Sequence, residues 1–116
     1  MRFKLLLVLV EDERLDTVLA AARDAGATGE TIIPSARGEG LARRKTFLGL
    51  DLSGQRDIAL LVVEEHLARG ILEAIAKAGR FDEEPGAGIA IQLPIEDAVG
   101  LEAQIRFLAK RLEDRL

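Results

Sequence analysis

The chain has 116 residues, close to the commonest size of a single domain, and 48% of them are hydrophobic, which is enough for a core. Its net charge of −4 argues against a nucleic-acid-binding surface over the whole protein. The absence of cysteine excludes disulfides, thiol catalysis and cysteine-held metal, and the single histidine, His66, cannot build a histidine-rich metal site alone. We therefore expect one domain over residues 1–116, with no metal site.

Residues 3–10, FKLLLVLV, form the first expected strand, and their continuous apolar run is typical of the centre of a sheet. The run is too short to span a bilayer. It also passes directly into acidic residues without a small-residue cleavage site, so it does not resemble a signal peptide. We expect a cytoplasmic protein with no direct insertion into a membrane.

A repeat organises the chain, because residues 8–27 resemble residues 61–80 at an offset of 53 positions. Each copy reads as an apolar strand, an acidic corner, an amphipathic helix and a glycine. The two glycines, Gly26 and Gly79, suit the left-handed position that ends many helices. The apolar faces of the two expected helices are Leu15, Val18, Leu19 and Ala22, and Leu67, Ile71, Ala74, Ile75 and Ala78.

The acidic corners are the pairs Glu11–Asp12 and Glu64–Glu65. Paired carboxylates can serve general acid–base catalysis. Their recurrence at two matching helix starts favours compensation of the helix dipole, which stabilises negative charge there. No nucleophile with an adjacent base is visible, so we expect no enzyme. His66 is expected at the surface or in a helix cap rather than on a metal.

Three further strands are expected at residues 30–36, 58–63 and 88–94. The order is strand, helix, strand, twice over, which predicts an α+β, ferredoxin-like βαββαβ fold. In this plan the first and third strands lie at the centre of the sheet and the second lies at an edge. The second strand carries Pro34, which an edge tolerates better than a central strand.

The connection between the second and third strands, residues 37–57, is too long for a tight hairpin. Its charged and apolar residues are the basic cluster Arg43, Arg44 and Lys45 and then Phe47, Leu48, Leu50 and Leu52. The basic cluster could meet phosphates, dock on an acidic partner or simply be solvated. The apolar residues are costly to leave in water, since burying each is worth about 1.5–3 kcal/mol. We expect this segment to bury them against a partner, a ligand-ordered pocket or a neighbouring subunit.

Residues 97–116 read as an extra C-terminal helix, with an apolar stripe of Leu101, Ile105, Leu108 and Leu112. Its basic residues could meet a membrane surface, but interspersed acids favour ordinary packing. Both sides of the first strand are apolar, so the sheet keeps one apolar face after the two crossover helices cover the other. The last helix could cover part of that face, and association between copies is the other solution, which favours a homo-oligomer.

The glycine-rich corner Gly86, Ala87 and Gly88 has two interpretations. Its backbone N–H groups could bind an anion. Alternatively, it is only a turn that leads from Pro85 into the last strand. Arg80, the cation next to this corner, either replaces a phosphate-binding lysine or is a solvated residue after a helix.

Together, the repeat, the long connection and the glycine-rich corner resemble the PII signalling proteins over roughly residues 3–93. Residues 24–40, DAGATGETIIPSARGEG, are similar to the stretch that leads into the long T-loop of that family. The matching positions are Gly26, Gly29 and Thr31 in the spacing G-x-x-G-x-T, and Gly38 and Gly40 in G-x-G. The CutA proteins share the same trimeric plan, so the fold alone does not separate the two families.

The resemblance implies a homotrimer that binds adenine nucleotides in clefts between subunits and signals to a membrane transporter or metabolic enzyme of nitrogen or carbon metabolism. Residues 38–57 would be the T-loop. The residues implied at the nucleotide are Arg37, Gly38, Glu39 and Gly40 at the base of that loop, Gly86, Ala87 and Gly88 around the phosphates, and Thr31 near the neighbour's base. ATP, ADP or AMP would act as an effector, and no cofactor is required.

The chain departs from the PII pattern around the phosphates. Ala87 and Ile89 replace the family's aspartate and lysine, and residues 89–101 contain no arginine. Asp82, Glu83 and Glu84 add negative charge that opposes a triphosphate. There is no tyrosine to modify. The resemblance therefore indicates a divergent sensor. Two alternatives stay open: a CutA-like trimer with a metal-related or structural role, and an interaction module whose effector site has decayed.

Overall fold

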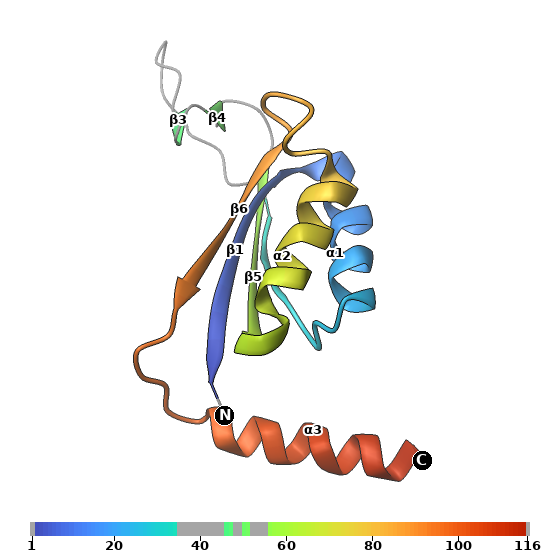
Figure 1. The fold of residues 1–116 in the computed structure, drawn as a ribbon, viewed down its shortest axis with the longest axis vertical. Helices are drawn as coiled ribbons and strands as arrows, with labels where there is room; N and C mark the ends of the chain where they lie inside the picture. The colour runs from blue at the N-terminus through green and yellow to red at the C-terminus, as the bar shows by residue number, and fades with distance from the viewer. Residues whose placement is uncertain (1, 35–45, 48–49, 52–55, 116) are drawn as a thin grey trace.

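A computed structural model of the protein describes residues 2–34, 46–47, 50–51 and 56–115. Two helices lie on one face of a four-stranded sheet, and a third helix stands apart beyond its lower end (Figure 1). The strands are β1 (Phe3–Glu11), β2 (Thr31–Ile33), β5 (Arg56–Glu64) and β6 (Gly88–Pro94). The short strands β3 (Thr46–Phe47) and β4 (Leu50–Asp51) pair with each other. The helices are the 3-10 turn η1 (Asp12–Arg14), α1 (Leu15–Asp24), α2 (Glu65–Gly79) and α3 (Leu101–Arg115).

The sheet has the strand order β2-β5-β1-β6, and every neighbouring pair is antiparallel. The two most continuously apolar strands, β1 and β5, therefore lie at the centre, while β2 and β6 form the two edges. This order confirms the predicted ferredoxin-like α+β fold. It also confirms that the second strand lies at an edge.

The predicted strand at 88–94 is confirmed without change, but the third strand is longer than expected. It begins at Arg56, so the predicted connection 37–57 and the predicted T-loop segment 38–57 are each two residues too long at their end. Residues 56 and 57 are charged, so the sequence placed them in the connection. In the structure the β1–β5 pairing continues through them, because Arg56 pairs with Glu11 at the end of β1. The second strand ends at Ile33, before Pro34, which has no N–H to donate.

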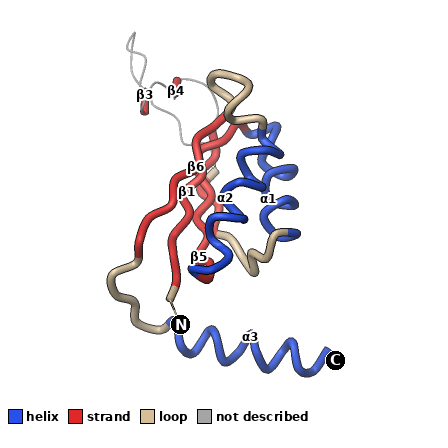
Figure 2. Tube along the Cα trace, viewed as in Figure 1, coloured by secondary structure: helices blue, strands red, loops and turns tan. Residues whose placement is uncertain are grey.

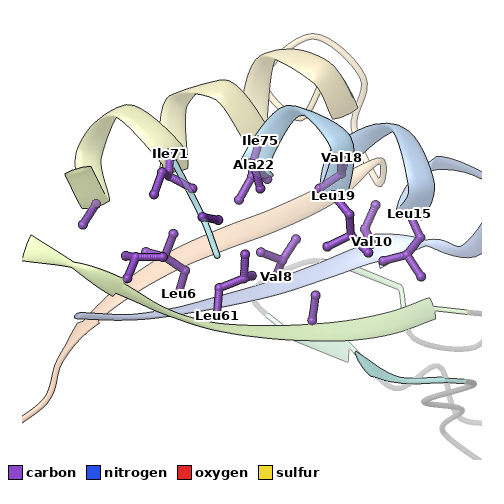
Figure 3. Close-up of a cluster of buried hydrophobic side chains, with 14 residues drawn as sticks. Leu6, Val8, Val10, Leu15, Val18, Leu19, Ala22, Leu61, Ile71 and Ile75 are labelled. Atoms are coloured by element: carbon purple, nitrogen blue, oxygen red, sulfur yellow. The ribbon is translucent and has the colours of Figure 1, made fainter. Parts of the chain in front are cut away.

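The core lies between α1, α2 and the inner face of the sheet (Figure 3). Alternate residues of β1 and β5 point into it, because successive strand side chains face opposite sides. The paired rows Leu6 with Leu61 and Val8 with Ala59 show this alternation. The largest fully buried side chains are Leu6, Leu61, Ile71, Ile75, Val8, Val10 and Val18. The predicted apolar face of the first helix is confirmed, since all four of its residues are buried.

The C-terminal helix begins at Leu101 rather than at residue 97. Gly100 adopts φ 93°, a conformation that a right-handed helix cannot continue through and that glycine adopts without strain. From there α3 runs outward near the N-terminus, away from the sheet (Figure 2). Phe107 in α3 is 56% exposed. The expectation that this helix covers part of the second sheet face is therefore wrong for the single chain.

The second face of the sheet, here called the open face, is apolar along all four strands. Its rows follow from the register, in which Leu5, Leu7 and Leu9 pair with residues of β5 on one side and β6 on the other. The apolar residues of the open face are Leu5, Leu7, Leu9, Ile33, Ile58, Leu60, Val62, Ile89, Ile91 and Leu93, and Thr31 shares the row of Leu60. Among the described residues, no helix is both long and apolar enough to cross a membrane.

Candidate functional site

The loop between α2 and β6 begins with Arg80 in a left-handed conformation, at φ 56° and ψ 40°. The N–H groups of Arg80 and Phe81 donate to carbonyls of the last helical turn at 3.2 and 3.0 Å, the pattern of a Schellman cap. The prediction that Gly79 takes the left-handed position is therefore wrong, because α2 runs one residue further than the repeat suggests. The prediction is confirmed for Gly26, which has φ 119° after α1.

The ring of Phe81 explains why glycine stands at positions 79 and 88. A Cβ atom on Gly79 would lie 2.3 Å from the ring, and one on Gly88 would lie 2.4 Å from it. A Cβ on Gly88 would also lie 2.6 Å from the carbonyl oxygen of Leu9. Both contacts are too short for any side chain, so these glycines allow the ring to close the end of α2 against the start of β6.

Gly86 and Ala87 form the turn that precedes β6. Gly86 has φ 84°, and its carbonyl accepts a hydrogen bond from Nη2 of Arg56 at 3.1 Å. The N–H of Ala87 donates to the carbonyl of Glu84 at 3.1 Å, and Ala87 is 1% exposed. The amide of Ala87 is therefore used within the turn. A ligand phosphate at this corner would need side-chain donors as well as backbone amides.

Side-chain donors do converge on this loop. Arg14, from the turn η1, donates from Nη1 to the carbonyl of Gly79 at 2.7 Å and from Nη2 to the carboxylate of Glu84. Arg80 donates from Nε and Nη2 to Glu83 at 3.0 and 2.9 Å, and its Nη1 lies 3.1 Å from Oε1 of Glu84. We call Arg14, Arg80, Glu83 and Glu84 the arginine–glutamate cluster.

A second group of charges adjoins this cluster where β1 and β5 pair. Glu11 lies 3.6 Å from Nε of Arg14 and 3.9 Å from Nη2 of Arg56. The carboxyl of Asp12 is hydrogen-bonded to Asp57, which is 3% exposed. This hydrogen bond, followed by repulsion between the two carboxylates, raises the pKa of Asp12 above its usual range.

The acids at the helix starts occupy the positions predicted for dipole compensation, with Asp12 and Glu13 in the first turn of η1 and Glu65 in that of α2. Glu11 also links the loop cluster to β5. His66 lies at the surface, as predicted, with 73% of its side chain exposed.

Thr31 lies far from the glycine corner within one chain. It is in β2 at one edge of the sheet, whereas Gly88 begins β6 at the other edge. Three strand spacings separate these edges, or about 14 Å at roughly 4.8 Å per spacing. Thr31 and the corner Gly86–Gly88 are therefore not neighbours within one chain.

The remaining residues expected at the site lie outside the described residues: Arg37, Gly38, Glu39, Gly40, Arg43, Arg44, Lys45 and Leu48. Phe47 is described only through the backbone pairing of β3 with β4. Among the residues that the structure describes, no group of three or more histidine, cysteine or acidic side chains could hold a metal ion.

Sequence reasoning missed Arg14 and Arg56 as parts of this region. Both lie in charged stretches that read as helix start and loop. They meet residues 79–86 only because the fold brings the ends of β1 and β5 beside the loop after α2. The spacing in the sequence, 65 and 30 positions, carries no local signal of these contacts.

A family model described as "Nitrogen regulatory protein P-II" matches residues 3–104. The chain belongs to the P-II family. The match extends past the predicted limit of residue 93 into the start of α3, and it favours P-II over the CutA alternative. No curated protein matches the sequence.

Among solved structures, the chain resembles CPII from Thiomonas intermedia K12, in a structure with bound ADP, AMP and acetate. The TM-score is 0.62 at 18% sequence identity, over 85% of this chain and 91% of CPII. At this identity the likeness establishes that the two proteins share the P-II fold.

Proposed function

We propose that this protein is a homotrimeric P-II signalling protein that binds an adenine nucleotide between subunits and regulates a membrane transporter or a metabolic enzyme. The observation that carries the proposal is the separation of Thr31 and the corner Gly86–Gly88 on opposite edges of the sheet. In the proposed trimer the β2 edge of one subunit lies beside the β6 edge of the next, since head-to-tail contacts form a ring where the rotation closes.

The open face supports assembly. Ten apolar side chains line it, of which Leu9 is already buried in the single chain, and a contiguous apolar face of this kind is typical of an interface. Ile33, Val62 and Leu93 on this face are each more than a third exposed in the single chain. Burying them between subunits is favourable by roughly 25 cal/mol per Å² of apolar area.

An adenine nucleotide is the effector that the comparisons support best. The P-II family matches the chain over residues 3–104, and the similar fold of CPII was solved with ADP and AMP. Arg14 and Arg80 supply guanidinium groups beside the corner, and arginine binds phosphate through paired donors. Asp82, Glu83 and Glu84 oppose a high ligand charge, so ADP and AMP should bind more tightly than ATP.

The regulatory output is assigned to the segment that follows Pro34. In this proposal Arg37, Gly38, Glu39 and Gly40 lie beside the nucleotide, and the basic and apolar residues from Arg43 to Leu48 contact the partner. The nucleotide shifts the segment by binding one of its states more tightly than the other. The protein acts in the cytoplasm as a regulator without catalysis, with no required cofactor and no contact with nucleic acid.

Isothermal calorimetry of the purified protein with ATP, ADP, AMP and cyclic AMP tests the effector. We expect measurable heat for ADP and AMP and weaker binding of ATP. No heat above background for all four nucleotides, on folded trimer, would remove nucleotide sensing from the proposal.

A second candidate is an interaction module that no longer senses an effector. The pairing of both arginines with glutamates favours it, since their charge is already balanced within the chain. Pull-down of the partner with and without ADP separates the two candidates. Nucleotide-dependent capture supports the sensor, and equal capture in both conditions supports the module.

A further inference from the structure

The carboxylate of Glu84 lies between two guanidinium groups. Its Oε2 accepts from Nη2 of Arg14, and its Oε1 lies 3.1 Å from Nη1 of Arg80. Two oxygens of one anion that each face an arginine form the arrangement by which proteins bind phosphate or carboxylate groups. Glu84 therefore sits where an anionic ligand group would make the same contacts.

Arg14 is held ready for such a group by contacts that do not involve Glu84. Its Nη1 donates to the carbonyl of Gly79 at 2.7 Å, and its Nε lies 3.6 Å from Glu11. Only 27% of the Arg14 side chain is exposed. Two contacts thus fix the plane of the guanidinium while Nη2 faces the loop, so the arginine is already oriented when an anion arrives.

Glu84, by contrast, can leave without moving the loop. Its backbone N–H donates to the carbonyl of Arg80 at 3.0 Å, and its own carbonyl accepts from Ala87 at 3.1 Å. The side chain is held by the arginines, and 37% of it is exposed. Rotation about its side-chain bonds would release both guanidinium groups and leave the turn in place.

The left-handed conformation of Arg80 also favours a role in binding an anion. At this position glycine would avoid the steric cost that a side chain carries. A residue that breaks a local rule of this kind is often retained for a functional reason. Here the arginine at the helix end presents its guanidinium beside the loop, where it pairs with Glu83 and Glu84.

We propose that Glu84 is a displaceable internal anion, and that the phosphate of the effector replaces it on Arg14 and Arg80. This inference rests on the proposed nucleotide function and identifies the residues that take the place of the lysine absent after Gly88. The phosphate binds the two arginines more tightly than the Glu84 carboxylate does, because it carries more charge and more acceptor oxygens. Release of the Glu84 side chain into solvent then accompanies ligand binding.

The test is calorimetry with ADP on the full chain. Glu84→Gln removes the competing charge, so ADP affinity should rise about tenfold, the effect of roughly one charge-assisted hydrogen bond. Asp82→Asn is the matched control, since it removes the same charge from the same loop and Asp82 makes no ion pair with any described residue. A gain of about twofold is expected there from weaker long-range repulsion.

Arg14→Gln completes the test. Placed in the Glu84→Gln background, it should abolish the gain, because the phosphate loses its oriented donor. Equal gains for Glu84→Gln and Asp82→Asn, or no gain for Glu84→Gln, would overturn the displacement while leaving nucleotide binding intact. Absence of ADP binding in both wild type and Glu84→Gln would overturn the displacement and the nucleotide function together. Binding by Glu84→Gln alone would also overturn the displacement, because ADP would then be unable to release the native carboxylate.

Circular dichroism melting checks the fold of each variant, and Glu84→Ala provides a second replacement. If both Glu84 variants failed to fold, the carboxylate would be a structural tie that the native protein cannot release, and the proposal would be wrong.

Discussion

At the scale of single residues, the ring of Phe81 requires glycine at the end of α2 and at the start of β6. Gly88→Ala would force a Cβ into the ring and into the carbonyl oxygen of Leu9. We expect it to lower the free energy of unfolding by about 1–3 kcal/mol, as overpacking does. Chemical denaturation with linear extrapolation measures this change.

The matched control is Gly70→Ala, in the exposed middle of α2, where an added Cβ meets no atom within 4 Å. It should raise the free energy of unfolding by about 0.5–1 kcal/mol, because alanine favours a helix more than glycine does. If Gly88→Ala left stability unchanged or raised it, as Gly70→Ala should, the packing role of Phe81 would be refuted.

The raised pKa of Asp12 predicts that the stability of the protein depends on pH through this residue. Its pKa is raised in the folded protein by Asp57, so the folded state holds this proton more tightly than the unfolded chain does. The favourable contribution is complete below the ordinary aspartate pKa of about 3.9 and is lost as pH rises through the higher folded pKa. Asp12→Asn should therefore raise the melting temperature at pH 7 and leave it nearly unchanged at low pH.

Glu13→Gln is the control for this effect. Glu13 lies in the same first turn of η1 and is exposed, and its charge raises the pKa of Asp12 less than Asp57 does, so Glu13→Gln should give a smaller pH-dependent gain. Thermal melts of both variants from pH 3 to pH 8 measure the difference. A gain that did not depend on pH would mean that Asp12 acts through packing or helix propensity instead.

At the scale of elements, α3 is the helix least tied to the rest of the chain. The family match ends at residue 104, inside α3, and the helix runs outward from the sheet (Figure 1). A chain that ends at residue 99 should unfold cooperatively and bind ADP with a free energy within about 0.5 kcal/mol of the full chain. Loss of ADP binding in the truncated chain would place α3 at the ligand site.

The main elements could be predicted from the sequence because their signals are local. Continuous apolar strands, 3.6-residue helix faces and glycines at a fixed offset gave the order and the edges of the sheet. The predicted ends of helices and strands were wrong where they are not set by a local sequence signal. The pairing of Glu11 with Arg56 extends β5, and α2 ends one residue later than the repeat indicates, with Arg80 in the left-handed position.

The candidate site could be predicted less well, because its side chains come from separate parts of the chain. The loop around Gly86 and the cation Arg80 carry local signals. Arg14 and Arg56 carry none, since charged residues near helix starts and loops are usually solvated. Only the packing of η1 and β5 beside the loop brings them to it.

At the scale of the whole molecule, assembly should depend on the open face. Val62 is 42% exposed in the single chain, so Val62→Asp is tolerated by the folded subunit but places a charge in the proposed interface. We expect it to shift the protein from trimer to monomer in sedimentation velocity. Val99→Asp, at a fully exposed position outside the sheet, should leave the trimer intact.

If Val62→Asp remained trimeric, the open face would not be the surface that joins the subunits. If Val99→Asp also dissociated, the effect would reflect added charge rather than the place of the substitution.

The central claim is that two copies of this chain build each ligand site, because Thr31 and the corner Gly86–Gly88 lie on opposite edges of one sheet. Native mass spectrometry with ADP measures assembly and ligand occupancy in one experiment. The claim predicts trimers that carry up to three ADP molecules, and ADP-free monomers for Val62→Asp. A monomer that binds ADP as well as the trimer does would contradict it.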